Sequence, residues 1–328
     1  MKAIEIVGAG KDATLRLGDA PDPRPGPGEV LIEVAATAVN RADLLQRSGL
    51  YPPPPGASPI LGLECSGTIA ELGSGVTDWS VGDRVCALLP GGGYAEKAVA
   101  HAGSLLPVPP ALSLVEAGGL PEVFLTCSLN LFELALAERG AWALVHGGGS
   151  GVGTAAIQLL KRAGVSTIVT AGSDEKCRRC LELGADLALN YRELDGKFAA
   201  PVLEATGGRG VDLVLDSIGA SYLAQHLEAL AIGGRLVVIG LMGGARAELD
   251  LGVVLRKRIT LIGSTLRARS PDEKAGIVAY FLDRFGAALE RGELRPIVHA
   301  VLPLAEAQRA HDMVEASEHF GKVVLAVG

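Results

Sequence analysis

The segment Ala141–Gln158 reads A-W-A-L-V-H-G-G-G-S-G-V-G-T-A-A-I-Q. A short apolar run leads directly into glycines, and a helix-like stretch follows that ends near Ala163. In this context a glycine loop binds a dinucleotide, because free backbone N–H groups and the helix dipole both face the pyrophosphate. The fingerprint here is Gly148, Ser150 and Gly153, with serine in place of the usual middle glycine. The segment therefore predicts the first strand and helix of a dinucleotide-binding domain.

Apolar strands and helix-like segments alternate after this loop at the rhythm of βαβ units. Runs rich in Val, Ile and Leu are typical of a parallel sheet that is covered on both faces. Such runs are Ser166–Ala171, Val211–Ile218, Arg235–Leu241 and Ile259–Ser264. The α/β part of the chain is therefore expected to be a Rossmann domain, a doubly wound parallel sheet, over residues 120–265.

The first third of the chain consists of short strand-like runs that are interrupted by proline-rich and glycine-rich turns. Val30–Ala36, Cys65–Leu72 and Asp83–Leu89 are the clearest of these runs. A long helix-like stretch after Ser270 and a last strand, K-V-V-L-A-V, are expected to return to this part of the molecule. The predicted division is a β-rich domain of residues 1–119 and 266–328, with the Rossmann domain of residues 120–265 inserted in it.

The composition excludes several classes of protein. The chain has 328 residues, of which 48% are hydrophobic and 20% charged, and this balance excludes wholesale disorder. A net charge of −7 without a basic run argues against nucleic acid as a partner. No apolar run is long enough to span a membrane, and Glu5 interrupts the only candidate for a signal peptide, so the cytoplasm is the expected compartment.

The five cysteines do not suggest a disulfide framework, because their number is odd and they are sparse. Cys177 and Cys180 have C-x-x-C spacing, which leaves a metal or redox role open as the alternative. No second pair and no nearby histidine accompany them, and they fall in a helix-like segment. We therefore expect them to be ordinary helix positions.

The end of the second Rossmann strand distinguishes the two nicotinamide cofactors. An acid at this place usually binds the ribose 2′-hydroxyl of NAD, but here the strand ends in Ala171, Gly172 and Ser173. Gly172 leaves room, Ser173 offers a hydroxyl and Lys176 adds a positive charge. This set favours a 2′-phosphate and hence NADPH, the alternative being that Lys176 is only a solvated helix residue.

Several pieces along the chain together resemble the medium-chain dehydrogenase/reductase superfamily, and within it the zinc-free quinone oxidoreductase branch. The combination of Y-P-P-P-P-G-A-S, A-L-L-P-G-G-G and G-S-G-V-G-T-A-A-I-Q-L is most similar to the p53-inducible subfamily. The resemblance covers nearly the whole chain and implies that the β-rich domain is a GroES-like catalytic domain. The pieces that carry it are Pro25–Val34, Ala38–Arg47, Leu61–Thr68, Val81–Tyr94, the glycine loop, and the later motifs L-N-Y-R, D-S-I-G, V-I-G-L-M-G-G and F-G-K-V-V-L.

The resemblance also implies which residues bind NADPH. Ser150, Gly151, Val152 and Gly153 correspond to the pyrophosphate loop. Ser173, Lys176 and Tyr191 correspond to the 2′-phosphate pocket, and Ser217 to the adenosine half. The expected neighbours of the nicotinamide end are Asn40, Thr126, Leu241 and Leu266, with Lys322 either reaching the cofactor or lying on the surface.

The zinc ligands of the alcohol dehydrogenase branch have no counterparts here. Asn40 stands where that branch has cysteine, Leu63 stands where it has histidine, and the four-cysteine lobe is missing. We therefore expect no metal, and an acceptor that takes hydride without a Lewis acid. A quinone meets this requirement, because the aromatic oxyanion that forms is delocalised.

The candidate catalytic residues are Asn40, Tyr51 and Asp43, and the candidate substrate contacts are Tyr51, Phe124, Met242 and Gly243. We expect them at a cleft between the domains. For Tyr51 the alternative is packing against the prolines that follow it, and for Asp43 it is helix capping or a salt bridge.

Two other functions and an assembly remain open at this point. NADPH-dependent reduction of an enoyl thioester or an enone also needs no metal, and Tyr51 is the residue to test as its proton donor. A non-catalytic, cofactor-binding regulatory protein is the alternative from another class. The expected partners are a small-molecule quinone and a second copy of the chain, as a homodimer or homotetramer with Ile259–Ser264 as a pairing edge.

Overall fold

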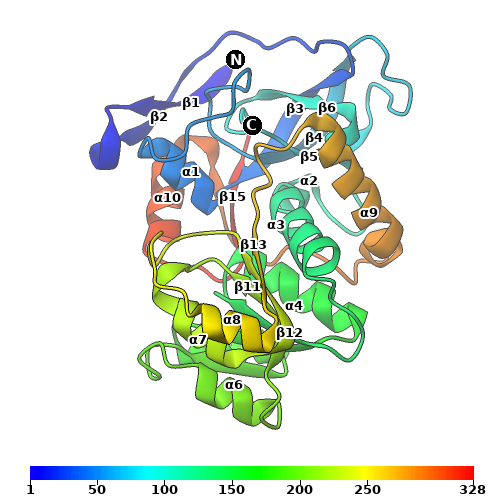
Figure 1. Ribbon diagram of the computed structural model, residues 1–328. Helices are drawn as coiled ribbons and strands as arrows, with labels where there is room; N and C mark the ends of the chain where they lie inside the picture. Colours follow the sequence, from blue (N-terminus) through cyan, green and yellow to red (C-terminus); the bar gives the residue numbers. More distant parts are fainter. The chain divides into compact units, whose positions relative to one another are not determined.

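The computed structural model describes all 328 residues, which fall into two compact units. Unit 1 comprises Met1–Leu125 and Leu266–Gly328, and unit 2 comprises Thr126–Thr265. The chain thus leaves unit 1 after Leu125, later than the expected position near Leu120, and returns to it at Leu266. The two units are coloured along the sequence in Figure 1.

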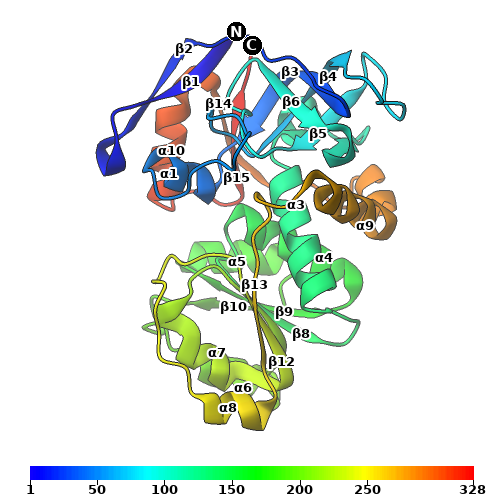
Figure 2. The same ribbon diagram turned by 45° about the horizontal axis from the view of Figure 1, so that its top comes forward.

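Unit 2 is built on a parallel sheet of six strands in the order β10-β9-β8-β11-β12-β13. The chain starts in the middle of this sheet with β8 and adds β9 and β10 on one side. It then crosses over to place β11 on the other side of β8, so the strand order reverses between the neighbours β8 and β11. This is the strand order of the Rossmann fold, which binds its ligand at the point where the order reverses. Helices lie on both sides of the sheet, with α4 on one side and α6 and α7 on the other (Figure 2).

The sequence of unit 2 explains why its sheet is buried between two layers of helices. Both faces of a doubly covered sheet are apolar, and the side chains of β8 from Ala143 to Val145 have no exposed surface. Phe198, Val202 and Leu227 from the covering helices pack in the same core. The elements of unit 2 are β8 Trp142–His146, α4 Gly151–Ala163, β9 Ser166–Ala171, α5 Asp174–Leu183, β10 Leu187–Asn190, α6 Ala199–Ala205, β11 Val211–Asp216, α7 Leu223–Ala229, β12 Leu230–Val238, α8 Leu251–Lys257 and β13 Thr260–Gly263.

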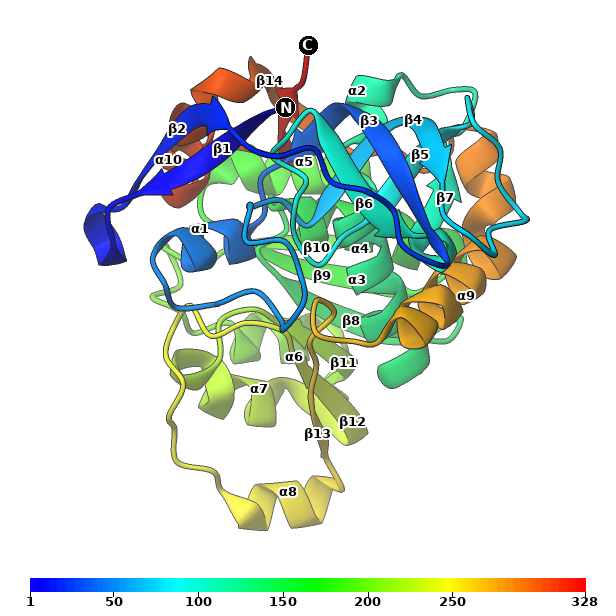
Figure 3. The ribbon, with the colours of Figure 1, turned by 90° about the horizontal axis from the view of Figure 1, so that it is seen from above.

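Unit 1 is a mainly antiparallel, β-rich unit, as the sequence predicted for the first third of the chain. Its large sheet runs β14-β15-β3-β4-β5-β7, with β6 paired to β3, and β1 and β2 form a separate hairpin. The long helix α9 lies along the β7 side of this sheet, as Figure 3 shows. The elements of unit 1 are β1 Lys2–Val7, β2 Thr14–Asp19, β3 Glu29–Ala38, α1 Arg41–Arg47, β4 Glu64–Leu72, β5 Arg84–Leu88, β6 Lys97–His101, β7 Leu105–Pro107, α2 Leu114–Ala117, α9 Pro271–Glu290, β14 Val298–Pro303, α10 Ala307–Glu315 and β15 Lys322–Ala326.

The boundary between the units falls within the helix α3, which spans Pro121–Cys127 and continues as a π-helical segment over Ser128–Leu134. The C-terminal segment belongs to unit 1, since β15 pairs with β3 through Val324 and Ala38. No helix combines the length and the apolar character that crossing a lipid bilayer requires.

Candidate functional site

The glycine loop after β8 joins the strand to helix α4. Gly147 has φ +68°, a left-handed conformation that side chains with a Cβ rarely adopt. Ser150 is the N-cap of α4, and its Oγ accepts a hydrogen bond from the N–H of Gly153 at 3.0 Å. The N–H groups of Gly151 and Val152 belong to the first turn, where a helix has no carbonyl partners to offer. The loop thus presents two N–H donors and the positive end of a helix dipole to an anion.

Two glycines of this loop have no room for a side chain. A Cβ atom at Gly153 would lie 2.2 Å from the carbonyl oxygen of Gly147, and one at Gly148 would lie 2.8 Å from Val169. The serine at position 150 is compatible with the loop because its side chain serves as the cap. The loop therefore meets the requirements of a pyrophosphate cradle without the middle glycine.

The loop after β9 carries the residues that were expected around a 2′-phosphate. Ser173 is the N-cap of α5, and its Oγ accepts a hydrogen bond from the N–H of Lys176 at 3.3 Å. Tyr191 covers Gly172 so closely that a Cβ there would lie 2.8 Å from the tyrosine hydroxyl. Burial lowers the pKa of Lys176, and the positive charge of Arg192 adds to this effect.

Arg192 is a residue that the sequence analysis missed. It follows Tyr191 in the segment after β10, and its charge acts on Lys176 from a different element. The signal in the sequence was the Y-R pair, of which only the tyrosine was used. The nearby carboxylate of Asp174 has a protein partner, because its Oδ1 accepts a hydrogen bond from Asn190 Nδ2 at 2.8 Å.

The loops after β11 and β12 place the remaining expected residues of unit 2. Ser217 directly follows β11, and its carbonyl accepts a hydrogen bond from the N–H of Met242 at 3.3 Å. Leu241 and Met242 are more than half exposed, and Gly243 lies beside them with its N–H bonded to the carbonyl of Ile218. These loops and the two described above all follow the carboxyl ends of parallel strands, which is where this fold binds ligands.

Asn40 in unit 1 is held by a buried ion pair. Its Nδ2 donates to Glu64 Oε1 at 2.8 Å, and its Oδ1 accepts from Lys322 Nζ at 2.7 Å. Lys322 Nζ also donates to Glu64 Oε1 at 2.8 Å and to the carbonyl of Val39 at 3.2 Å. The three N–H groups of the ammonium are therefore directed at partners inside unit 1, so Lys322 is not a surface lysine, and its contact with the cofactor stays a prediction.

Glu64 is the second residue that the sequence analysis did not single out as functional. Its side chain is buried, and its other oxygen, Oε2, accepts the backbone N–H of Glu122 at 2.9 Å. The carboxylate thus connects β4, helix α3 and the loop before α1. Its only sequence signal was its place in the triplet Gly62 to Glu64, which had been used to compare Leu63 with a zinc ligand.

Asp43 has the helix-capping role that was expected as the alternative to catalysis. Its Oδ2 accepts from the N–H of Asn40 at 2.8 Å, and its Oδ1 accepts from the N–H of Gly62 at 3.1 Å. Burial raises the pKa of Asp43 to about 6, although these two hydrogen bonds favour the charged form. Because the side chain has no exposed surface, its geometry supports positioning of Asn40 and not contact with a substrate.

Tyr51 is half-buried and lies against a buried arginine. The guanidinium carbon of Arg267 is 5.3 Å from the centre of the Tyr51 ring, a cation–π distance. Burial raises the pKa of the Tyr51 hydroxyl, and the charge of Arg267 opposes that rise. No protein group pairs with this hydroxyl, so it is free to donate a hydrogen bond.

Three other expected residues are buried within their own units. Phe124 has no exposed surface and packs on Phe281 with ring centres 6.2 Å apart, so the structure gives it a core position and no face for a substrate. Leu266 is buried in unit 1. Thr126 is buried in unit 2, where its carbonyl accepts a hydrogen bond from Asn130 at 2.7 Å.

Glu122 is a half-buried titratable group that the sequence analysis did not identify. Its Oε2 is buried without a hydrogen-bond partner. Burial and the nearby carboxylate of Glu64 raise the pKa of Glu122 to about 8, while Lys322 and Lys274 oppose the shift. The raised pKa favours the protonated form of this carboxyl at neutral pH.

One group of metal-ligating side chains is present, and it lies in the core of unit 2. His146, His226 and Asp216 come together there, with the two Nε2 atoms 2.8 Å apart in a hydrogen bond. His146 Nδ1 is also bonded, to Thr170 Oγ1 at 2.9 Å. Burial lowers the pKa of both histidines, which favours their neutral forms in this hydrogen-bonded part of the core.

Cys177 and Cys180 are buried positions of α5, and burial raises the pKa of both thiols. A raised pKa makes the reactive thiolate scarce. Both cysteines therefore pack as ordinary buried residues of the helix.

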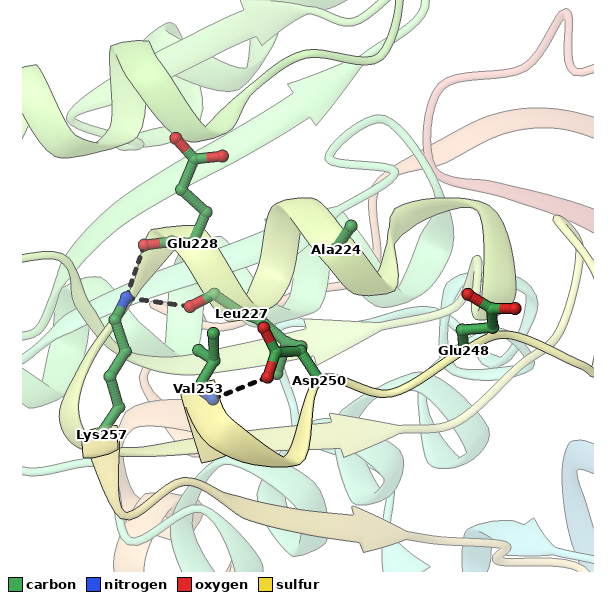
Figure 4. A pocket seen from close by; sticks show the side chains of 7 residues that line it. All are labelled: Ala224, Leu227, Glu228, Glu248, Asp250, Val253 and Lys257. Carbon is green, nitrogen blue, oxygen red and sulfur yellow. Dashed lines mark hydrogen bonds between the residues drawn. The ribbon is translucent and has the colours of Figure 1, made fainter. Parts of the chain in front are cut away.

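A surface groove in unit 2 contains none of the expected site residues. It has a volume of about 370 Å³ and lies between α7 and α8. Figure 4 shows Lys257 reaching across it, where its Nζ donates to the carbonyls of Leu227 and Glu228 at 2.9 and 2.7 Å. The lysine thereby caps the carboxyl end of α7, which identifies the groove as a helix-packing feature.

Both halves of the chain match known families. Residues 26–110 match the alcohol dehydrogenase GroES-like domain, and residues 151–281 match the family described as zinc-binding dehydrogenase. The donor set around Asn40 does not suit zinc, because it consists of an amide, a carboxylate that already accepts three hydrogen bonds, and an ammonium group. The second match begins at α4, covers the rest of unit 2 and continues into α9 of unit 1.

Curated and solved relatives extend over the whole chain. The quinone oxidoreductase of Rattus norvegicus is 31% identical over 328 residues, which cover 99% of this chain and 97% of the relative. The structure of Escherichia coli quinone oxidoreductase complexed with NADPH superposes with a TM-score of 0.86 at 28% identity and covers 99% and 100% of the two chains. The structure of JamJ enoyl reductase gives a TM-score of 0.87 at 26% identity and covers 100% and 99%. With this coverage, and with the glycine cradle and the Asn40 cluster in place, the chain belongs to the quinone oxidoreductase family of the medium-chain dehydrogenase/reductase superfamily.

Proposed function

We propose that this protein is an NADPH-dependent, metal-independent oxidoreductase that reduces quinones. The observation that carries the proposal is the fixed Asn40 cluster. In it, Asn40 Oδ1 accepts a hydrogen bond from Lys322 and Asn40 Nδ2 donates one to Glu64, and Lys322 also pairs with Glu64. The ammonium group of Lys322 thus provides a positive charge next to Asn40. An acceptor that takes hydride without a Lewis acid fits such a site.

The residues of unit 2 support NADPH as the cofactor. Gly151 and Val152 present N–H groups suited to the pyrophosphate, and the paired charges of Lys176 and Arg192 suit a 2′-phosphate. NADPH supplies a hydride from its nicotinamide ring when it is bound. The name of the Escherichia coli structure, a complex with NADPH, agrees with this assignment.

The acceptor is proposed to bind beside Tyr51. A half-buried aromatic ring with a free hydroxyl offers a surface for a flat ring and a hydrogen-bond donor for a carbonyl oxygen. A quinone that gains a hydride becomes an aromatic oxyanion, which water or Tyr51 can protonate. Orientation of the acceptor is then the main contribution of the protein.

Reduction of an enoyl thioester or an enone is the second candidate, and the similarity to JamJ enoyl reductase favours it. This reaction leaves an enolate, which benefits from a proton donor more than a hydroquinone does. Tyr51 and the protonated Glu122 are the groups of this chain that can serve in that role. A non-catalytic cofactor-binding protein is the third possibility.

NADPH oxidation with an ortho-quinone, measured with a chelator present and repeated with NADH and with an enone, tests the proposal. Chelator-resistant turnover that prefers NADPH and the quinone would support it. Turnover of the enone alone would transfer the assignment to the second candidate. NADPH binding without turnover of either acceptor would refute both enzymatic functions.

We also propose a homodimer, with a tetramer as a pair of such dimers. Strand β13 is an edge of the parallel sheet and pairs only with β12. Its residue Leu261 is 41% exposed, and Leu251 and Leu255 of the preceding helix α8 are exposed as well. An apolar edge strand of this kind is a template for pairing with a second copy of the sheet.

A further inference from the structure

Arg267 is a buried arginine with an unusual set of partners. Its side chain is 4% exposed, yet no carboxylate lies within ion-pair distance of its guanidinium group. Burial lowers its pKa, and the more distant charges of Asp43 and Glu122 oppose this effect. An unpaired buried charge is expensive, so packing alone would be served better by a neutral side chain.

What the arginine provides is a set of directed N–H groups that connect three segments of unit 1. Nε donates to the carbonyl of Pro90 at 2.7 Å, Nη1 to the carbonyl of Tyr51 at 3.3 Å, and Nη2 to Gln46 Oε1 at 2.6 Å. The rigid, planar guanidinium group is suited to such fixed geometry, whereas lysine offers a single point charge.

The partners of Arg267 hold both ends of the proline-rich segment Tyr51–Pro59. Tyr51, at its start, receives a hydrogen bond at its carbonyl and the guanidinium group against its ring. Pro59, at its end, accepts a hydrogen bond from Gln46 Nε2 at 2.9 Å. The segment Pro52–Pro55 contains no N–H donors, so it takes part in backbone hydrogen bonds only as an acceptor, as the Pro54 carbonyl does from the N–H of Ala57 at 3.0 Å.

The arginine is itself fixed from behind. Lys274, a buried residue of α9, donates from Nζ to the carbonyl of Arg267 at 2.8 Å. The glycines beside Pro90 allow the two loops to pack, since a Cβ at Gly91 would lie 2.6 Å from the carbonyl of Ser58.

From this arrangement we propose that Arg267 is a positioning residue, which orients Tyr51 for the acceptor and thereby determines acceptor affinity without contacting acceptor or cofactor. The inference rests on the proposed function, in which Tyr51 receives a planar carbonyl acceptor. It adds a residue that neither the sequence motifs nor the family descriptions identify.

The test compares Arg267→Lys in the wild-type, Tyr51→Phe and Tyr51→Leu backgrounds. We expect Arg267→Lys to raise the KM for the acceptor about tenfold, with kcat changed less than about twofold and the NADPH Kd unchanged. The same substitution should have that effect with Tyr51→Phe, which keeps the ring, and little effect with Tyr51→Leu. Additive effects in the Tyr51→Leu background, or a weaker affinity for NADPH, would refute the proposal.

Arg47→Lys is the matched control, since Arg47 is also a buried arginine of unit 1 and pairs with Glu315 at 2.9 Å. It should lower Tm without raising the acceptor KM, and an equal rise in KM would contradict the proposal. If Arg267→Lys does not fold, Gln46→Met removes the Nη2 contact and the Gln46–Pro59 hydrogen bond but leaves the other two Arg267 contacts, and it is expected to raise the KM in the same direction.

Hydrogen exchange of the free protein gives a result that does not depend on turnover. Arg267→Lys should accelerate exchange at the amides of Gly56–Ile60 and leave the glycine loop Gly147–Gly153 unchanged. Unchanged exchange at Gly56–Ile60 would refute the positioning role even if no quinone is reduced. Wild-type protein without activity but with accelerated exchange in the variant would refute only the proposed function.

Discussion

Two lysines of this protein lie in different electrostatic surroundings. Lys322 is buried, and its three protons are taken by Val39, Asn40 and Glu64. Lys176 is only partly buried, next to the charge of Arg192 and the hydroxyl groups around Gly172. A lysine beside a like charge is unfavourable by itself, and a bound phosphate would neutralise both cations. The positive charges of Lys176 and Arg192 are the basis for the proposed 2′-phosphate site, whereas Lys322 belongs to the Asn40 cluster.

Replacement of Lys176 by alanine tests the 2′-phosphate pocket. We expect the Kd for NADPH to rise about tenfold, which corresponds to about 1.4 kcal/mol, because one charge-assisted contact is lost. The Kd for NADH should stay within about twofold. Titration of nicotinamide fluorescence measures both constants, and Lys197→Ala serves as the control at an exposed lysine. An equal loss of affinity for both cofactors would contradict the pocket assignment.

Glu122 makes the stability of the protein depend on pH. Its pKa is about 8 in the folded protein and 4.5 by its ordinary value, so the folded state binds the extra proton between these values. Stability from this group is complete below the lower value and is lost as the pH rises through the upper one. The groups that act on the carboxyl are Glu64, Asp43, Lys322 and Lys274.

We therefore expect Glu122→Gln, which is neutral and of the same shape, to stabilise the protein at pH 8 by about 1–3 kcal/mol relative to the wild type. The difference should vanish near pH 4.5, the ordinary pKa of the group. Urea unfolding of both proteins at several pH values measures it. A difference that is independent of pH would show that the carboxyl does not titrate in this range.

At the scale of elements, the parts that could be predicted from the sequence are those with a local cause. Strand β8, the glycine loop and α4 follow from an apolar run, a glycine cluster and a serine cap, all within one segment. Strand β10 was missed, because Leu187–Asn190 has only four residues, all half-buried, and contains no β-branched residue. Strand β12 begins at Leu230, earlier than expected, and continues through Gly233 and Gly234, which resemble a turn in sequence.

The candidate site shows the same limit. Ser150 and Ser173 stand directly before α4 and α5, so the local sequence predicts their positions, whereas Tyr191 was expected only from the family resemblance and its contact with the cofactor stays a prediction. The partnership of Lys322 with Glu64 depends on residues 258 positions apart in the chain, and that of Arg267 with Gln46 on residues 221 apart. No local pattern encodes which buried carboxylate or amide a distant cation will meet.

Gly153→Ala tests the junction of loop and helix. The added Cβ would lie 2.2 Å from the Gly147 carbonyl, so the loop must move and its N–H groups lose their alignment. We expect the NADPH Kd to rise at least about tenfold and the unfolding free energy to fall by about 1–3 kcal/mol. Calorimetric titration and urea unfolding measure the two effects. Gly263→Ala in β13 is the control, since a Cβ there meets no atom within 4 Å, and the prediction fails if both variants bind NADPH alike.

At the scale of the whole molecule, the exposed edge strand β13 is the surface that we propose pairs with a second copy of the chain. The prediction is that Leu261→Lys, which places a charge on strand β13, shifts the protein from dimer or tetramer towards monomer. Sedimentation velocity over a range of protein concentrations measures this shift. Val7→Lys replaces a similarly exposed apolar residue of unit 1 and should leave the assembly unchanged. Unaltered sedimentation of Leu261→Lys would exclude this edge from the interface.

The return of the chain to unit 1 has a consequence for the order in which the protein folds during synthesis. All of Thr126–Thr265 is contiguous, so unit 2 can complete its sheet as soon as that stretch has left the ribosome. Unit 1 cannot, because β15 lies between β14 and β3 in its large sheet and is made last. The nascent chain therefore carries a finished Rossmann unit while the open edge of β3 waits for its final partner. Premature termination near the C-terminus leaves that edge exposed to aggregation.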